Sequence, residues 1–126
     1  MAGVTVTRRR STLTARNKLP RLRSLLVDRA KVVTYLLNRE HPDGRHKAAF
    51  FERFGFKVEE WTVLAEGLRS HGRTHLVVTL VESSHGTRYI VEGEIVTPDG
   101  RNPRIRTVWL VEAKTTPPRL ITAYPV

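Results

Sequence analysis

The segment between residues 41 and 47 combines basic side chains with the expected start of a helix. Four of its residues are basic or imidazole-bearing: His41, Arg45, His46 and Lys47. The first backbone N–H groups of a helix are unpaired and lie at the positive end of its dipole, so basic side chains beside them complete a site for a phosphate. The alternative is an ordinary turn in which Lys47 packs its aliphatic stem and keeps its ammonium group in water.

A second group of residues suited to phosphate chemistry lies near the end of the sequence. It consists of three arginines and two hydroxyl residues: Arg104, Arg106, Arg119, Thr122 and Tyr124. Residues two apart on a strand face the same side, so Thr122 and Tyr124 would project together. Guanidinium and hydroxyl donors suit a phosphorane-like transition state, in which negative charge develops on the non-bridging oxygens. Alternatively, the hydroxyl residues are ordinary strand residues and the arginines keep the sheet edge soluble.

The first group lies where two expected helices meet. The apolar spacing predicts a helix over residues 25–38, with Asp28 as its N-cap. A second helix is predicted over residues 45–54, with Asp43 as its cap and Gly55 as its C-terminal stop. A lysine heads the stripe of this second helix that is expected to face the core: Lys47, Phe50, Phe51 and Phe54.

The second half of the chain predicts a sheet. A third helix is expected over residues 58–68 and a break over residues 70–73, after which the apolar period changes from about 3.6 to 2. Four runs rich in β-branched and aromatic residues follow, separated by turn signals: HLVVTLVE, RYIVEGEIV, RIRTVWLVE and RLITAY. Short connections indicate antiparallel pairing. We therefore expect an α+β fold, with N-terminal helices packed on a four-stranded antiparallel sheet.

The charge of the chain points to a polyanionic partner. The 126 residues include 22 Lys and Arg against 12 Asp and Glu, which gives a net charge of +10. Such a surplus repels itself unless a polyanion compensates it, and nucleic acid is the commonest such partner. We expect residues 1–18 to form a basic, flexible arm that adds affinity for RNA phosphates, and residues 19–126 to form a single domain. A disordered tail without function is the alternative for the arm.

Several classes of site are excluded or unsupported. Without cysteine, the chain has no disulfide, cysteine-based zinc site or thiol nucleophile. The histidines form no metal-binding motif, and no P-loop, GxSxG or GxGxxG motif occurs. No run approaches the roughly 18 apolar residues of a spanning helix. We therefore expect no metal, no cofactor and no membrane partner, and a cytoplasmic location.

Two segments carry a resemblance to a known family. The runs YLLNREHPDGRHKAAFFERFGF and TVWLVEAKTTPPRLITAYP resemble an uncharacterised family of small bacterial domains that occur beside toxin–antitoxin and polymorphic-toxin genes. The resemblance covers about residues 19–125. More distantly, the order of elements resembles the ribonuclease-toxin group of barnase, EndoU, colicin-type tRNases and RelE. The resemblance implies a metal-independent endoribonuclease toxin with an acidic antitoxin or immunity protein as partner.

The resemblance also implies roles for particular residues. Five positions form the implied catalytic set: His41, Lys47, Arg106, Thr122 and Tyr124. His41 would be the general base or acid, Lys47 and Arg106 would hold the scissile phosphate, and the two hydroxyl residues would position it. Other basic residues are expected to bind nucleic acid: Arg8, Arg9, Arg10, Arg45, His46, Arg104 and Arg119. A non-catalytic RNA- or DNA-binding module and a protein-interaction domain are the alternatives.

Overall fold

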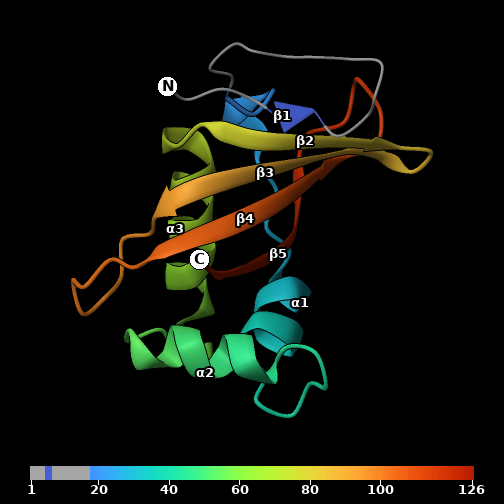
Figure 1. The fold of residues 1–126 in the computed structure, drawn as a ribbon. Helices are drawn as coiled ribbons and strands as arrows, with labels where there is room; N and C mark the ends of the chain where they lie inside the picture. The colour runs from blue at the N-terminus through green and yellow to red at the C-terminus, as the bar shows by residue number, and fades with distance from the viewer. Residues whose placement is uncertain (1–4, 7–17) are drawn as a thin grey trace.

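Helices pack against an antiparallel sheet in the computed structural model, which describes residues 5–6 and 18–126 (Figure 1). The sheet contains β2 (Val77–Ser83), β3 (Gly86–Glu94), β4 (Arg104–Val111) and β5 (Arg119–Pro125), each antiparallel to the next. A two-residue strand, β1 (Thr5–Val6), pairs in parallel with β2. The predicted α+β fold with four antiparallel strands is confirmed. Arg8, Arg9 and Arg10 lie outside the described residues.

The first helix is shorter than predicted. It comprises α1 (Arg29–Lys31), which continues as a π-helical segment over Val32–Leu36. The preceding residue Leu26 uses its backbone in strand-like pairing: its N–H donates to the Pro118 carbonyl oxygen at 2.9 Å, and its carbonyl oxygen accepts from Leu120 N–H at 2.9 Å. Because these groups are engaged beside β5, the helix begins only after Asp28. Asp28 occupies the N-cap position as predicted, although its carboxylate makes no cap hydrogen bond.

The second helix, α2 (Arg45–Arg53), closely matches its prediction. Its N-cap is Gly44, so the expected Asp43 cap is wrong. Among the phenylalanines predicted to face the core, Phe51 is fully buried and Phe50 packs against the core while partly exposed. Phe54 instead lies under a guanidinium group, 4.4 Å from its ring centroid to the Arg101 carbon.

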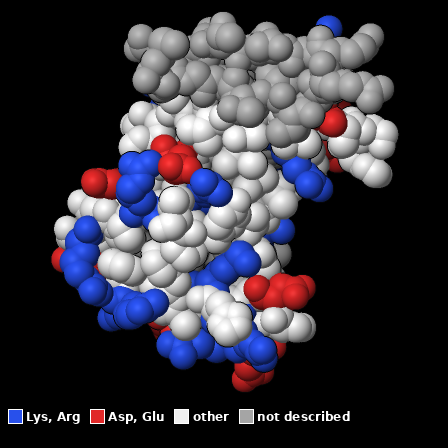
Figure 2. Space-filling view, in the orientation of Figure 1, with Lys and Arg blue, Asp and Glu red and all other residues white. Residues whose placement is uncertain are grey.

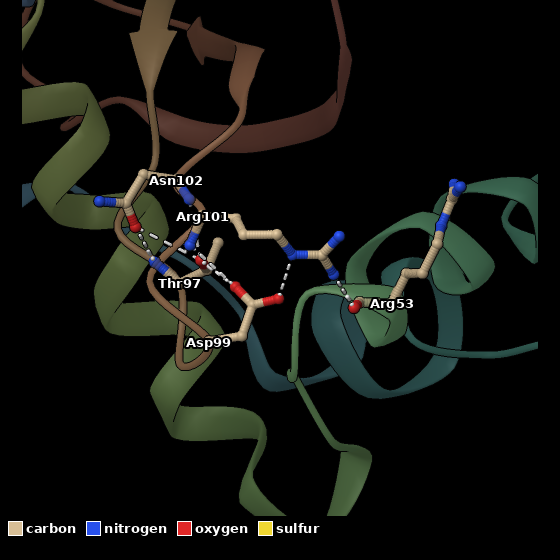
Figure 3. Close-up of polar contacts among 5 residues, drawn as sticks. All are labelled: Arg53, Thr97, Asp99, Arg101 and Asn102. Atoms are coloured by element: carbon tan, nitrogen blue, oxygen red, sulfur yellow. Dashed lines mark hydrogen bonds and ion pairs between the residues drawn. The ribbon is translucent and has the colours of Figure 1, made fainter.

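The β3–β4 loop fixes the C-terminal end of α2 (Figure 3). The Arg101 guanidinium donates to Asp99 at 2.6 Å and to the Arg53 carbonyl oxygen at 2.6 Å. Thr97 Oγ1 also donates to Asp99, at 2.8 Å, and Asn102 Oδ1 accepts from Thr97 N–H at 2.9 Å. The hydrogen bond from the backbone N–H of Arg101 is the main reason that the pKa of Asp99 lies below its usual value. These contacts hold α2 in a defined position relative to the sheet.

The third helix is longer than predicted. A 3₁₀ turn over Val58–Glu60 leads into α3 (Trp61–Thr74), which packs behind the sheet (Figure 1). The predicted break over residues 70–73 is wrong. A Cβ on Gly72 would lie 2.8 Å from the buried Trp109 ring and 3.0 Å from Leu25. This glycine therefore permits close packing of the helix on the core and does not end it.

The two glycines of α3 should respond oppositely to a methyl group. Gly72→Ala is expected to lower the free energy of unfolding by about 1–3 kcal/mol, because the added carbon overpacks the contact with Trp109. Gly67→Ala should raise it by up to about 1 kcal/mol, since alanine favours the helix and the nearest atom, on Ile95, is 3.4 Å away. Urea denaturation of both variants checks the signs, and a stabilising Gly72→Ala would contradict the packing argument.

Candidate functional site

Tyr35 connects the segments that carry the predicted site. Its hydroxyl lies 3.0 Å from Thr122 Oγ1 on β5, and its ring centroid lies 5.0 Å from that of His41. The Lys47 ammonium nitrogen is 5.5 Å from the centre of the Tyr35 ring, and that of Lys31 is 5.1 Å away. The structure thus brings His41, Lys47 and Thr122 together around a tyrosine. Neither Tyr35 nor Lys31 belonged to the predicted set.

A surface depression of about 400 Å³ adjoins this tyrosine. It lies between the first helix and the turn that leads into α2, and its lining residues are Asp28, Ala30, Lys31, Thr34, Tyr35 and His41. Lys and Arg side chains gather over the α1 and α2 region, with a few carboxylates among them (Figure 2). Arg45 and His46 are exposed on the first turn of α2, next to Lys47. The depression therefore lies in a largely cationic setting.

The turn before α2 depends on Gly44. Its φ of −95° is open to any residue, but a Cβ at this position would clash with the Tyr35 carbonyl oxygen. The close approach of the two backbones places His41 beside the Tyr35 ring. The carbonyl oxygen of His41 also accepts from Arg45 N–H at 3.0 Å, which ties the turn to the helix.

The imidazole of His41 acts as a side-chain cap for this turn. Its Nδ1 accepts hydrogen bonds from the backbone N–H groups of Asp43 and Gly44, both at 3.0 Å. An Nδ1 that accepts carries no proton, so the neutral ring holds its proton on Nε2. His41 therefore offers an N–H donor at Nε2 and has its other nitrogen occupied.

This arrangement predicts the tautomer of His41 directly. Long-range ¹H–¹⁵N spectra of the folded protein at pH 8 should show the Nε2–H form of His41 as the dominant neutral species. The exposed His85, whose ring lies in the β2–β3 turn, provides an internal reference with no such backbone constraint. A dominant Nδ1–H form of His41 would contradict the geometry of the turn.

Arg106 lies on the sheet with Tyr124 and Glu92. It pairs across the strands with Glu92 on β3 and Tyr124 on β5, and the side chains of these two residues raise the pKa of its guanidinium group. Arg106 Nε donates to Glu92 Oε2 at 2.7 Å, and Arg104 Nη2 donates to Glu92 Oε1 at 2.9 Å. The hydrogen bonds from these two arginines lower the pKa of Glu92, which keeps the carboxylate ionised at neutral pH. Glu92 was not among the predicted site residues.

A β-bulge aligns Thr122 and Tyr124 with these partners. The register shifts between Val108 and Trp109, so buried Leu120 lies opposite Trp109 while Thr122 lies opposite Val108. Thr122 and Tyr124 then share one face of β5, about 7 Å apart at the usual rise of a strand. The residues around Tyr35, which include Thr122, and the residues around Arg106, which include Tyr124, therefore lie next to each other along β5. Arg119 lies near the other end of this strand and pairs with Glu112 at 3.4 Å.

Two histidines at the C-terminal end of α3 contact the sheet. The His71 and His75 rings lie one helical turn apart, with centroids separated by 4.8 Å. Each approaches a backbone carbonyl oxygen of β3: His71 Nε2 reaches Gly93 at 3.0 Å and His75 Nε2 reaches Glu94 at 2.8 Å. Within the described residues, no group of three or more potential metal-ligating side chains comes together. None of the helices described has the length and hydropathy of a membrane span.

These features define a small α+β domain whose polar cluster lies where the turn before α2 meets β5. The chain belongs to the family described as a domain of unknown function, DUF6883, which matches residues 18–126. It is also similar to a chain from a contact-dependent growth inhibition toxin–immunity protein complex of Klebsiella pneumoniae 342. That similarity has a TM-score of 0.65 and 20% identity, and covers 80% of this chain and 99% of the other. At this level of identity it shows a shared fold. No curated protein matches the chain.

Proposed function

We propose that this domain is a metal-independent endoribonuclease toxin that is neutralised by an acidic antitoxin or immunity protein. The observation that carries the proposal is the convergence of His41, Lys31 and Lys47 on Tyr35, which joins Thr122 on β5. This group offers cationic and N–H donors beside an open depression, as phosphate binding requires. The toxin assignment is supported by the shared fold with a chain from a toxin–immunity complex.

The reaction proposed is attack of the ribose 2′-hydroxyl on the adjacent phosphorus. The O2′–P bond forms and the P–O5′ bond breaks, which leaves a 2′,3′-cyclic phosphate and a 5′-hydroxyl. A base must remove the 2′-hydroxyl proton, an acid must protonate the departing 5′-oxygen, and donors must stabilise the charge on the phosphorane. One P–O bond forms as another breaks, and one proton is removed as another is delivered, so the proposed step balances without a co-substrate.

The contacts around His41 support a revised role for it. With Nδ1 accepting two backbone N–H groups, we assign Nε2–H as a neutral donor to a phosphate oxygen, in place of the general base or acid predicted. Lys47, Lys31 and Arg106 supply the positive charge. Thr122 holds Tyr35 in place.

The two proton transfers are assigned to side chains on the sheet. We assign Glu92, which is bonded to Arg106, as the acceptor of the 2′-hydroxyl proton. Tyr124, the cross-strand partner of Arg106, is assigned as donor to the 5′-oxygen. Arg45, His46 and Arg104, together with the basic arm, would contact neighbouring phosphates without reading sequence. Acting on cellular RNA, the domain would work in the cytoplasm.

Incubation of the purified chain with a single-stranded RNA in excess EDTA tests the proposal. We expect cleavage products with 2′,3′-cyclic phosphate and 5′-hydroxyl ends, and the same fragments in total RNA after induced expression. Intact RNA in both assays would contradict the nuclease. If RNA binding then persisted with a steep salt dependence and fell on removal of residues 1–18, the chain would be a non-catalytic binding module.

A further inference from the structure

The depression beside Tyr35 contains a carboxylate that phosphate binding does not explain. Asp28 is the acidic member of its lining, in a setting otherwise rich in Lys and Arg. The side chain is exposed and does not cap the helix that it precedes. Its carboxylate forms no ion pair or hydrogen bond within the described part of the chain, and only its backbone carbonyl oxygen accepts a bond, from Val32 N–H at 3.3 Å. A carboxylate weakens anion binding close to it, but it can accept hydrogen bonds from the N–H or O–H donors of a ligand.

Asp28 lies at one end of a row of side chains. At the other end are the contacts around Tyr35, to which phosphate binding is assigned. Asp28 is the N-cap, Lys31 ends α1 and Tyr35 lies in the π-helical segment that follows, and all three line the depression. At the α-helical rise seven residues would span about 10 Å, and the π-helical part shortens this length, which is still of the order of the distance from a nucleotide's phosphate to its base. The volume of about 400 Å³ is of the size that one nucleotide needs.

We propose that this depression is a nucleotide subsite that selects guanine, with the phosphate at Lys31 and His41 and the base edge at Asp28. The proposal rests on RNA being the ligand of the domain. A carboxylate accepts two parallel hydrogen bonds, and guanine alone among the four bases presents two adjacent N–H donors, N1–H and N2–H, on its Watson–Crick edge. Adenine and cytosine place an acceptor beside their amino group, and uracil flanks one N–H with two carbonyl groups. Each of these would bring an oxygen or nitrogen lone pair against Asp28.

Calorimetric titration of the full chain with nucleoside 3′-monophosphates tests this subsite without requiring cleavage. Guanosine 3′-monophosphate should bind at least about tenfold more tightly than the adenosine, cytidine and uridine compounds, as expected for one bidentate pair. Deoxyguanosine 3′-monophosphate should retain that preference, because Asp28 contacts the base. Asp28→Asn should bring the four affinities within about threefold of one another while phosphate binding remains.

Asp43→Asn is the matched control, since it makes the same change of charge in the neighbouring turn, outside the lining of the depression. It should leave the order of affinities intact. Equal binding of the four nucleotides by the wild type, or an unchanged guanine preference in Asp28→Asn, would overturn the subsite. A preference for ribose over deoxyribose without base selection would also overturn it. RNA cleavage with no base preference would refute the subsite alone, whereas guanine-selective binding without cleavage would refute the nuclease alone.

Discussion

Lys47→Ala is expected to reduce kcat/KM for cleavage of a single-stranded RNA by about 100-fold. The ammonium group lies beside the Tyr35 ring and supplies charge where the phosphorane would develop its own. Removal of one donor that acts in a transition state typically costs 10²- to 10³-fold, and Lys31 would compensate in part. Single-turnover cleavage, with enzyme in excess over a labelled oligonucleotide, measures the effect without interference from product release.

Lys57→Ala is the control for this change. Lys57 is exposed in the segment between α2 and α3, so its removal lowers the net charge equally without touching the cluster. We expect its activity to stay within threefold of wild type, and both variants to keep the wild-type Tm within a few degrees. An equal loss in the two variants would mean that Lys47 contributes only general electrostatic attraction.

Acidification from pH 6.5 to pH 4 is expected to remove about 3 kcal/mol of unfolding free energy through one residue, His71. Its ring is buried between α3 and the sheet, where Nδ1 accepts from the Thr107 hydroxyl at 3.0 Å and Nε2–H donates to Gly93. The hydroxyl in turn accepts from Trp109 Nε1–H at 2.8 Å, which completes a neutral network. Burial, reinforced by the nearby His75, lowers the pKa of His71 from 6.5 to about 4.

Proton binding explains why the unfolding free energy falls, and does not rise, on acidification. Between pH 4 and 6.5 the unfolded chain binds a proton at this histidine and the folded chain does not, so stability falls as pH falls. The contribution is complete above pH 6.5 and lost by about pH 4. Urea denaturation across this range measures it. His71→Gln should be less stable at pH 7.5 with a shallower slope, whereas His85→Gln, in an exposed turn, should keep the wild-type slope. If the unfolding free energy of His71→Gln depended on pH as steeply as that of the wild type, groups other than His71 would cause the loss.

The strands and α2 could be predicted from the sequence because their apolar periods are regular and their ends carry turn residues. The errors lie where tertiary contacts override local signals. Gly72 resembles a helix stop, but it is a contact point for Trp109, a residue 37 positions later in the chain. Leu26 belongs to an apolar helical run, yet its backbone pairs beside β5. Neither partner can be inferred from neighbouring residues alone.

The candidate site was predicted in part for a similar reason. His41 and Lys47 lie close together in the sequence, and the alternation of β5 correctly placed Thr122 and Tyr124 on one face. Glu92 was missed because its pairing with Arg106 depends on strand register, which the runs of apolar residues do not fix. Tyr35 falls within the predicted helix over residues 25–38 and was assigned no role in the site. Its position just before the 41–47 segment was a usable signal.

The hydrogen bond between Tyr35 and Thr122 also has a consequence for the order of assembly. It joins residues 87 positions apart, and β5 is the final strand of the sheet. Contacts of such high sequence separation form late, after the loop-closure entropy of the intervening chain has been overcome. During vectorial synthesis, the turn that carries His41 and the helix that carries Lys47 emerge long before their partner strand. We therefore expect a growing chain to stay inactive until β5 docks, which would separate the synthesis of such a protein from the onset of its activity.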